Sequence, residues 1–349
     1  MKYIVLAITL ISFLSPHLHA KMPNDRSQHK TRQEERKKAQ IKFDTWEQKN
    51  YLPLTSCEKQ SVLWDRVVSS EYKDLPSYEK LGLAQVLKMA VQPIRKKMNK
   101  ESDFAPIGWK KYLHKRAVVA KVKFTSLEDH PYTGFFKGTD CALLRLSVTY
   151  RPDPNDNEPV APGLALKAFR DGAPSANISA LYTLMGQGQN YNFFEKPLSN
   201  IVPRGHSAGE KVIHWIFRKV TKYPEELNMQ HMSKVREAGK VIESPYAPTQ
   251  IFFVPNKQKL SFSQDYHDIR DDLLKIKKET VLYKVYAIAE SDKYNNFYNY
   301  NIEDISKNLK DAQPIGEIST TSRFIASEFG DTGIFFKHEA QKNKDYQGK

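Results

Sequence analysis

Residues 110–169 contain three strand-like runs of sequence that are separated by turn-forming segments. In the first run, residues 118–125, apolar side chains occupy the even positions, and the odd positions are mostly polar and cationic. The second and third runs are residues 142–148 and 162–169. A period of two places alternate side chains on opposite faces of a strand. We therefore predict consecutive strands of one sheet, with an apolar face and a mostly cationic face.

His114 shares its even numbering with the apolar positions of the first run. If the strand already starts at this residue, the imidazole points to the apolar face. A histidine in such a place is either a core residue with satisfied hydrogen bonds or a working acid–base group. The alternation by itself leaves both interpretations open.

The rest of the chain mixes helical and strand-like periods. Apolar spacings of three and four residues predict helices, and short β-branched or aromatic runs predict strands. The predicted helices are 57–98, in two pieces broken near Pro76, 212–220, 225–238 and 266–277. The predicted strands are 251–254, 281–289, 315–319 and 333–337. Strands, then helices, then strands again predict an α+β protein, a closed antiparallel β-barrel with inserted and flanking helices.

The first twenty residues have a pattern that is typical of export. Lys2 precedes an apolar stretch, 3–14, and a small residue follows at Ala20. This pattern predicts a secretory signal peptide and a periplasmic or secreted mature protein. The apolar stretch is shorter than the roughly 20 residues of a membrane span, so we expect no stable span after cleavage. An uncleaved anchor is the alternative interpretation.

These patterns predict five segments along the chain. They are a signal peptide at 1–20, a basic flexible segment at 21–45, an N-terminal helical arm at 46–109, a barrel domain at 110–340 and a tail at 341–349. The basic segment lacks an apolar stripe, and we therefore expect it to be flexible.

The chain is basic, with a net charge of +14 from 54 Lys and Arg against 40 Asp and Glu. Basic surfaces attract nucleic acids and anionic membranes. Aromatic residues do not interleave with the basic ones in a groove-like pattern, so we expect no nucleic-acid partner. The sequence leaves the oligomeric state open.

The chain has two cysteines, Cys57 and Cys141. An exported chain permits a disulfide between them, but the sequence leaves the pairing open. The chain contains neither an HExxH nor a CxxC motif, so nothing in it favours a metal-dependent hydrolase.

Seven short motifs follow one another between residues 110 and 338. They are Lys111 to His114 with Phe124, Arg145-Leu146-Ser147, Pro162 to Phe169, Tyr182 to Gly186, Phe193-Phe194, Pro314 to Glu317, and Ile334 to Phe336. In this order the motifs resemble those of the haem-dependent catalase superfamily. The resemblance implies the catalase core barrel and haem as cofactor.

The resemblance also implies roles for individual residues. His114 takes the place of the distal base, which moves a proton between the oxygens of a bound peroxide. Arg145 and Lys111 take the places of the family's propionate-anchoring arginines, and Ser147 can add a hydrogen bond. Lys111 is a departure from the pattern, because lysine lacks the planar two-pronged contact of arginine.

Two further family positions are less clear in this chain. The distal asparagine corresponds to Asn190 when a small insertion is allowed, and Gln187 or Asn177 are the alternatives. The family's iron ligand is a tyrosinate that follows an arginine by four residues, beyond the last strand. The only tyrosine in the tail, Tyr346, follows Lys342 instead, so the sequence leaves the iron ligand open.

Two functions therefore remain in competition. The first is a haem protein that acts on hydrogen peroxide or an organic hydroperoxide, as a weak catalase or peroxidase. The second is a haem-free barrel that binds a small ligand or a partner protein. The His114 and Arg145 motifs favour the first, and the missing proximal motif favours the second.

Overall fold

The computed structural model describes thirteen parts of the chain. They are residues 26–78, 102–109, 111, 114–127, 129–148, 162–182, 197–199, 234–237, 240–243, 248, 250–256, 268–288 and 309–336. The chain divides into two units, residues 1–46 and residues 47–349, which we describe separately.

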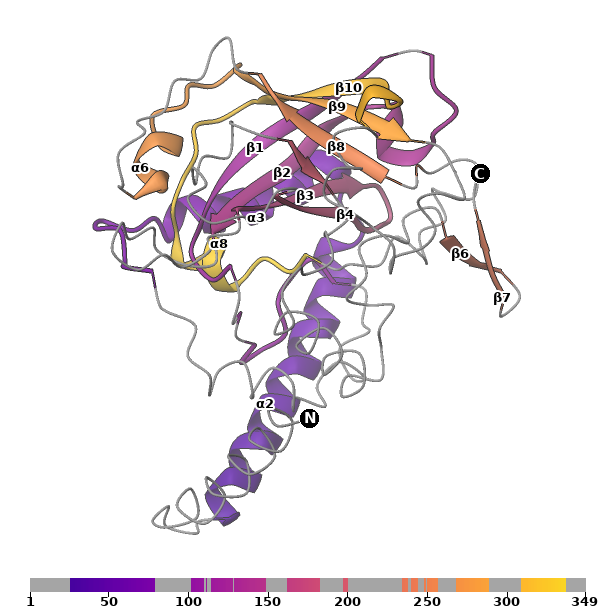
Figure 1. Cartoon of the computed structure of the whole chain (residues 1–349). Helices are drawn as coiled ribbons and strands as arrows, with labels where there is room; N and C mark the ends of the chain where they lie inside the picture. Colours follow the sequence, from indigo (N-terminus) through magenta and orange to yellow (C-terminus); the bar gives the residue numbers. More distant parts are fainter. Residues whose placement is uncertain are drawn as a thin grey trace, which may run out of the picture. The chain divides into compact units, whose positions relative to one another are not determined.

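The described part of the first unit is the 21-residue helix α2, Arg26–Trp46 (Figure 1). The sequence predicted a flexible basic segment at 21–45, whereas its described residues form a regular helix. Arg, Lys, Gln, Glu and Ala all have high helix propensity, so the segment forms a helix although it has no apolar stripe. Side-chain pairs add to this, and Gln40 Nε2 donates to Asp44 Oδ1 at 2.7 Å one turn along. Among the described helices, none has both the length and the apolar character of a membrane-crossing segment.

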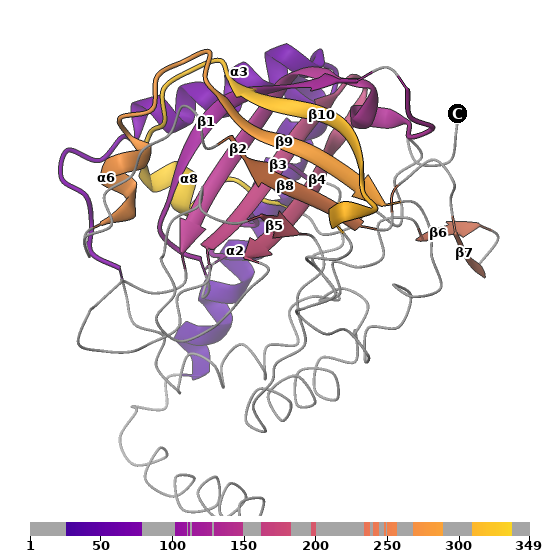
Figure 2. The same cartoon turned by 45° about the horizontal axis from the view of Figure 1, so that its top comes forward.

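The second unit is built on an antiparallel sheet (Figures 1 and 2). Its strands are β1 Ala117–Ser126, β2 Thr139–Val148, β3 Pro162–Arg170, β4 Ala173–Tyr182, β5 Leu198–Ser199, β8 Gln250–Pro255, β9 Val281–Ile288 and β10 Gln313–Thr320. A separate two-stranded sheet pairs β6, Lys234–Glu237, with β7, Lys240–Glu243. The predicted antiparallel sheet with a few helices is thus confirmed.

The main sheet curves into a half-barrel. Its strands pair in the order β1-β10-β9-β8-β5-β4-β3-β2, and β2 also pairs with β1. The connection between β4 and β8 runs through β5, which is only two residues long and has two paired positions on each side. Figure 2 shows β8, β9 and β10 curving over the strands β1 to β4.

The concave side of the sheet holds the apolar core. In β1 to β4 this core consists of even-numbered residues, none more than 3% exposed: Val118, Ala120, Val122, Phe124, Ala142, Leu144, Leu146, Val148, Leu164, Leu166, Ala168, Ala176, Ile178 and Ala180. The period-two prediction for 118–124 is therefore confirmed. The strand begins at Ala117, however, so its alternation does not reach His114.

The odd-numbered side of β1 to β4 is also covered. The helix α3, Ser56–Ser69, lies on it, and Lys59 of this helix donates to the carbonyl oxygens of Arg170 and Ala173 at 2.7 and 2.9 Å. The short helix α8, Glu328–Thr332, packs on the same side, where Gly330 lies against Val119. The odd-numbered side is only partly covered, since Lys123 and Thr125 of β1 remain exposed.

Shorter helical elements complete the second unit. They are the π-helix η1, Glu47–Tyr51, the 3-10 helix η3, Gly134–Lys137, and α6, Ile269–Leu273. The helix α3 confirms the first piece of the predicted helical arm, and residues 79–101 of that arm lie outside the described part of the chain. The helix predicted at 266–277 is confirmed at its centre by α6.

Two predicted elements are wrong where the structure describes them. Residues 234–237, placed in a helix by sequence, form β6, because Val235 and Arg236 pair with Ile242 and Val241 of the next strand. Residues 333–336 do not form a strand: Gly333 ends α8, and Ile334 makes an isolated bridge with Phe104. In both places pairing with another segment, β7 for residues 234–237 and Phe104 for Ile334, accompanies a backbone conformation that the local sequence pattern did not predict.

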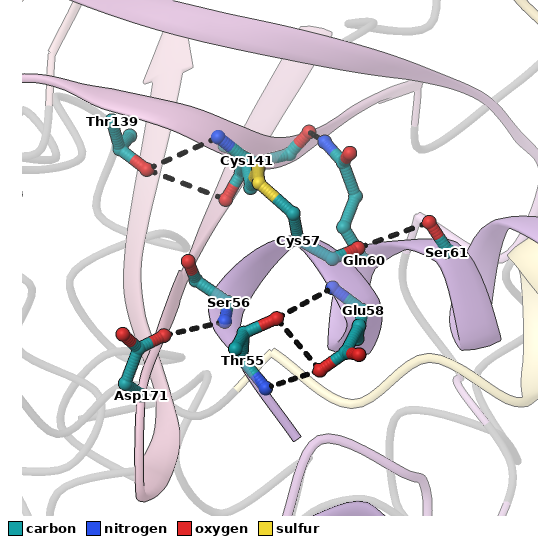
Figure 3. The surroundings of a disulfide bond; sticks show 10 residues. Thr55, Ser56, Cys57, Glu58, Gln60, Ser61, Thr139, Cys141 and Asp171 are labelled. Carbon is teal, nitrogen blue, oxygen red and sulfur yellow. Dashed lines mark hydrogen bonds between the residues drawn. A yellow bond between two sulfur atoms is a disulfide. The ribbon is translucent and has the colours of Figure 1, made fainter.

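A disulfide joins α3 to the sheet (Figure 3). Cys57 and Cys141 are 84 residues apart in the chain, and their Cα atoms lie 5.0 Å apart. Thr55 and Glu58 form a capping box at the start of α3, and Asp171 accepts from the Ser56 backbone N–H at 2.6 Å. The start of this helix is therefore tied both to β2 and to the β3–β4 turn.

Candidate functional site

Four of the residues singled out by sequence lie close together near the start of β1 and the end of β2. They are Lys111, His114, Arg145 and Ser147. Arg145 and Ser147 are odd-numbered residues of β2, so they lie on the side that α8 covers and not among the apolar interior. This cluster is the candidate site.

Arg145 is the centre of the cluster and is only 4% exposed. Its Nε donates to Gly330 O at 3.1 Å, its Nη1 to Ser147 Oγ at 3.2 Å, and its Nη2 to His114 O and Lys115 O at 2.7 and 3.0 Å. Burial lowers the pKa of Arg145 to about 10, against the opposing attraction of Asp331, so the guanidinium stays charged at neutral pH. All three nitrogens of the side chain are engaged by the chain itself.

Asp331 supplies the negative charge of this region. It is completely buried, and its Oδ1 lies 3.9 Å from Arg145 Nη2 and accepts from the Ala117 backbone N–H at 2.9 Å. Its Oδ2 accepts from Arg116 Nη1 and from Tyr72 Oη, both at 3.1 Å. One carboxylate of α8 therefore holds the start of β1, the buried arginine of β2 and the segment after α3 together.

Lys111 contributes a second cation that has no carboxylate in ion-pair contact among the described residues. Its Nζ donates to Ile334 O at 3.0 Å and lies 6.0 Å from the centre of the Phe336 ring. Burial, followed by the charge of Arg145, lowers the pKa of Lys111 well below its ordinary value. The amine is therefore easier to deprotonate than an exposed lysine.

His114 sits before β1 in a left-handed backbone conformation, with φ 51°. Its Nδ1 lies 3.3 Å from Ser147 O, and its carbonyl accepts from Arg145. Burial lowers the pKa of His114 to about 4, and the charge of Arg145 acts in the same direction. The ring is thus neutral at pH 7, but a pKa so far below the working pH makes it a weak general base.

The remaining sequence candidates divide into two groups. Asn190, Gln187 and Tyr346 lie outside the described residues. Asn177 lies on β4, where it pairs in register with Lys167 and its Nδ2 donates to Ser175 O at 3.3 Å. Asn177 therefore belongs to a second polar cluster and not to the group around Arg145.

The second cluster was missed by sequence reasoning and centres on Lys167 of β3. Lys167 Nζ donates to Asp103 Oδ1 at 2.8 Å and to Ser175 Oγ at 2.6 Å. Asp103 Oδ1 also accepts from the Ser175 hydroxyl, and its Oδ2 accepts from Tyr51 Oη at 2.9 Å. A lysine at an odd position of a strand pattern usually indicates solvent, so the sequence contained no signal for this cluster.

Haem would need free cations for its two propionates and a residue to bind its iron. Arg145 and Lys111 instead donate to the chain's own carbonyl oxygens, and Ser147 Oγ accepts from Arg145. The donors of Arg145 are thus engaged within the chain itself, which speaks against a propionate-anchoring role for this residue.

Comparison with known proteins leaves the family open. No family model, no curated protein sequence and no solved structure matches the chain. The catalase resemblance consequently depends on the order of short motifs alone.

Proposed function

We propose that the chain is an exported, haem-free module built on a catalase-like barrel, and that it acts by binding a small ligand or a partner protein. The observation that carries this proposal is that the guanidinium of Arg145 donates its hydrogen bonds within the chain. A propionate anchor must offer donors to a carboxylate, whereas the donors of Arg145 hold Gly330, His114 and Lys115. Its role is then to lock α8 and the start of β1 onto β2.

The proposal includes closure of the sheet into a barrel and export of the chain. Closure is supported by the strand order, in which β1 has hydrogen-bonded neighbours on both sides. Export is supported by the apolar N-terminal stretch and by the Cys57–Cys141 disulfide, since disulfides persist in oxidising compartments. Mass spectrometry of the protein from the native envelope tests export, and a cytosolic product with Met1 intact would contradict it.

Haem titration of the purified mature protein tests the central claim. We expect the absorbance spectrum to remain that of free haem, with no saturable shift of the Soret band. The variants Lys111→Met and His114→Asn serve as site variants, and Lys137→Met, at an exposed lysine, serves as the matched control. A saturable Soret shift in the wild type that is lost in the site variants and kept in the control would overturn the proposal.

The second candidate is a haem protein with peroxide or organic hydroperoxide chemistry. It is favoured by the assembly of Lys111, His114 and Arg145 in one place and by the neutral ring of His114 at pH 7. Under this alternative we expect only weak oxygen release from hydrogen peroxide, because the pKa of His114 is about 4 and Tyr346 lacks an arginine four residues earlier. Turnover like that of a family catalase would mean that a strong iron ligand lies elsewhere in the chain.

A further inference from the structure

A serine and a histidine meet at the end of β1, away from the cluster around Arg145. Ser126 is the last residue of β1, and its Oγ lies 2.9 Å from His130 Nε2. Contact between a serine hydroxyl and an imidazole nitrogen at hydrogen-bond distance is the arrangement that activates serine as a nucleophile. Ser126 is partly exposed, whereas His130 is 6% exposed, so the hydroxyl is accessible while the imidazole is held inside.

The imidazole of His130 is fixed by aromatic packing. It stacks on Tyr132 with ring centroids 5.4 Å apart, and Tyr132 in turn lies 5.9 Å from Phe136. Both aromatic residues belong to the apolar core of the half-barrel. The base is therefore anchored to the rigid part of the fold and not to a free loop.

The charge state of this pair suits a general base. Burial lowers the pKa of His130, the Lys137 ammonium lowers it further, and the backbone of Phe136 raises it in part. The ring is consequently neutral at pH 7. The Ser126 hydroxyl donates to Leu127 O at 3.0 Å. When the single proton of His130 is on Nδ1, the lone pair of Nε2 can accept the hydroxyl proton once the hydroxyl turns away from Leu127 O.

A glycine with a positive φ lies beside Ser126. Gly138 has φ +110°, a conformation that only glycine adopts readily, and a Cβ placed there would meet Ser126 N and Cβ at 3.8 and 3.9 Å. The β1–β2 pairing shifts between Val122 and Phe124, and such bulges are enriched next to active sites. Lys137 Nζ, which donates to His130 O at 2.9 Å, adds a positive charge near the pair.

We propose that Ser126 and His130 form a nucleophile–base pair that hydrolyses carboxylic esters. Ser126 Oγ attacks the ester carbonyl carbon while His130 Nε2 takes the hydroxyl proton. The bond to the alcohol oxygen then breaks, and Nε2 returns the proton to the leaving alcohol. A water molecule cleaves the acyl-serine in the same way, which releases the carboxylic acid and restores both side chains. The Lys137 ammonium stabilises the negative oxygen that forms during each attack.

Labelling with a fluorophosphonate probe, followed by peptide mass spectrometry, tests the nucleophile directly. We expect one adduct on the peptide that contains Ser126, and hydrolysis of p-nitrophenyl acetate above the buffer rate. His130→Asn should lower this rate by about 10²–10⁴-fold, the usual contribution of a general base. Ser126→Ala removes the nucleophile and should abolish the labelling and bring hydrolysis down to the buffer rate. Ser61→Ala is the matched control, because Ser61 is an exposed serine of α3 and should leave labelling and rate unchanged.

The pH profile separates catalysis from a structural role. With wild-type protein, the rate should be constant at neutral pH and fall only as the pH drops below the lowered pKa of His130. Circular dichroism shows whether each variant folds. If His130→Asn fails to fold, the folded Ser126→Ala variant carries the test. No adduct on Ser126, or unchanged hydrolysis in a folded Ser126→Ala variant, would overturn the proposal.

Discussion

Lys167 Nζ lies 2.8 Å from Asp103 Oδ1, and neither side chain is more than 1% exposed. The two residues are 64 positions apart in the chain. The attraction between the charges lowers the pKa of Asp103 below its usual value despite its burial. This ion pair fixes the segment around Asp103 onto the odd-numbered side of β3 and β4.

Replacement of one member of this pair should be costly. Lys167→Met leaves the Asp103 carboxylate buried without its cation, and loss of one partner of a buried pair typically costs about 3–5 kcal/mol. The exposed pair between Arg323 and Glu71 is the matched control, because Arg323→Met should cost less than about 1 kcal/mol. Urea denaturation measures both, and equal losses would show that burial of Lys167 is not the deciding factor.

His114 should make the folded state sensitive to mild acid. Its pKa is about 4 in the folded chain against an ordinary value of 6.5, so only the unfolded chain takes up a proton between these values. The free energy of unfolding is therefore full above pH 6.5 and decreases as the pH falls toward 4. His114→Asn, which also tolerates the positive φ, should remove this part of the pH dependence. An unchanged slope in that variant would contradict the assignment.

The Cys57–Cys141 disulfide should contribute strongly to stability. A bond that closes a loop of 84 residues restricts the unfolded chain, and such bonds typically contribute about 2–5 kcal/mol. We expect dithiothreitol to lower the melting temperature of the wild type. The double variant Cys57→Ser with Cys141→Ser should show the lower value from the start and should not respond to dithiothreitol.

Alanine at either of two glycine positions should destabilise the fold, for different physical reasons. A Cβ at Gly316 would lie 2.5 Å from the Phe124 ring and from Thr125 O, so Gly316→Ala forces β10 away from β1. Overpacking of this kind costs about 1–3 kcal/mol. Gly172 has open space around it and a φ of +61°, so Gly172→Ala should cost about 1–2 kcal/mol from backbone strain alone. Thermal denaturation should rank Gly316→Ala as the more harmful change, and the reverse order would contradict the packing argument.

Strand positions could be predicted where the pattern is local. Residues 118–124 alternate because each strand residue points opposite to its neighbour, and the structure confirms the even side as the core. The same alternation could not show where β1 begins. Ala117 starts the strand because its N–H donates to Asp331, which is 214 residues away in sequence.

For the candidate site too, the sequence predicted some features and only the structure showed others. The motif order singled out Lys111, His114 and Arg145, and the structure brings them together. The motifs could not show how the donors of Arg145 are used, because two of its partners, Gly330 and Asp331, come from a helix near the other end of the described chain. Whether an arginine binds a ligand or the chain depends on that distant helix.

The amino-acid sequence by itself determined the period-two strands, the first piece of the N-terminal helical arm, and the presence of two cysteines able to pair. Each of these depends on residues near one another in the chain, or on residue type alone. Only the tertiary structure decided that Lys167 is buried against Asp103, that Ser126 meets a packed His130, and that Arg145 is occupied. A buried charge or a reactive pair is defined by what surrounds it, and burial arises only when distant segments pack together.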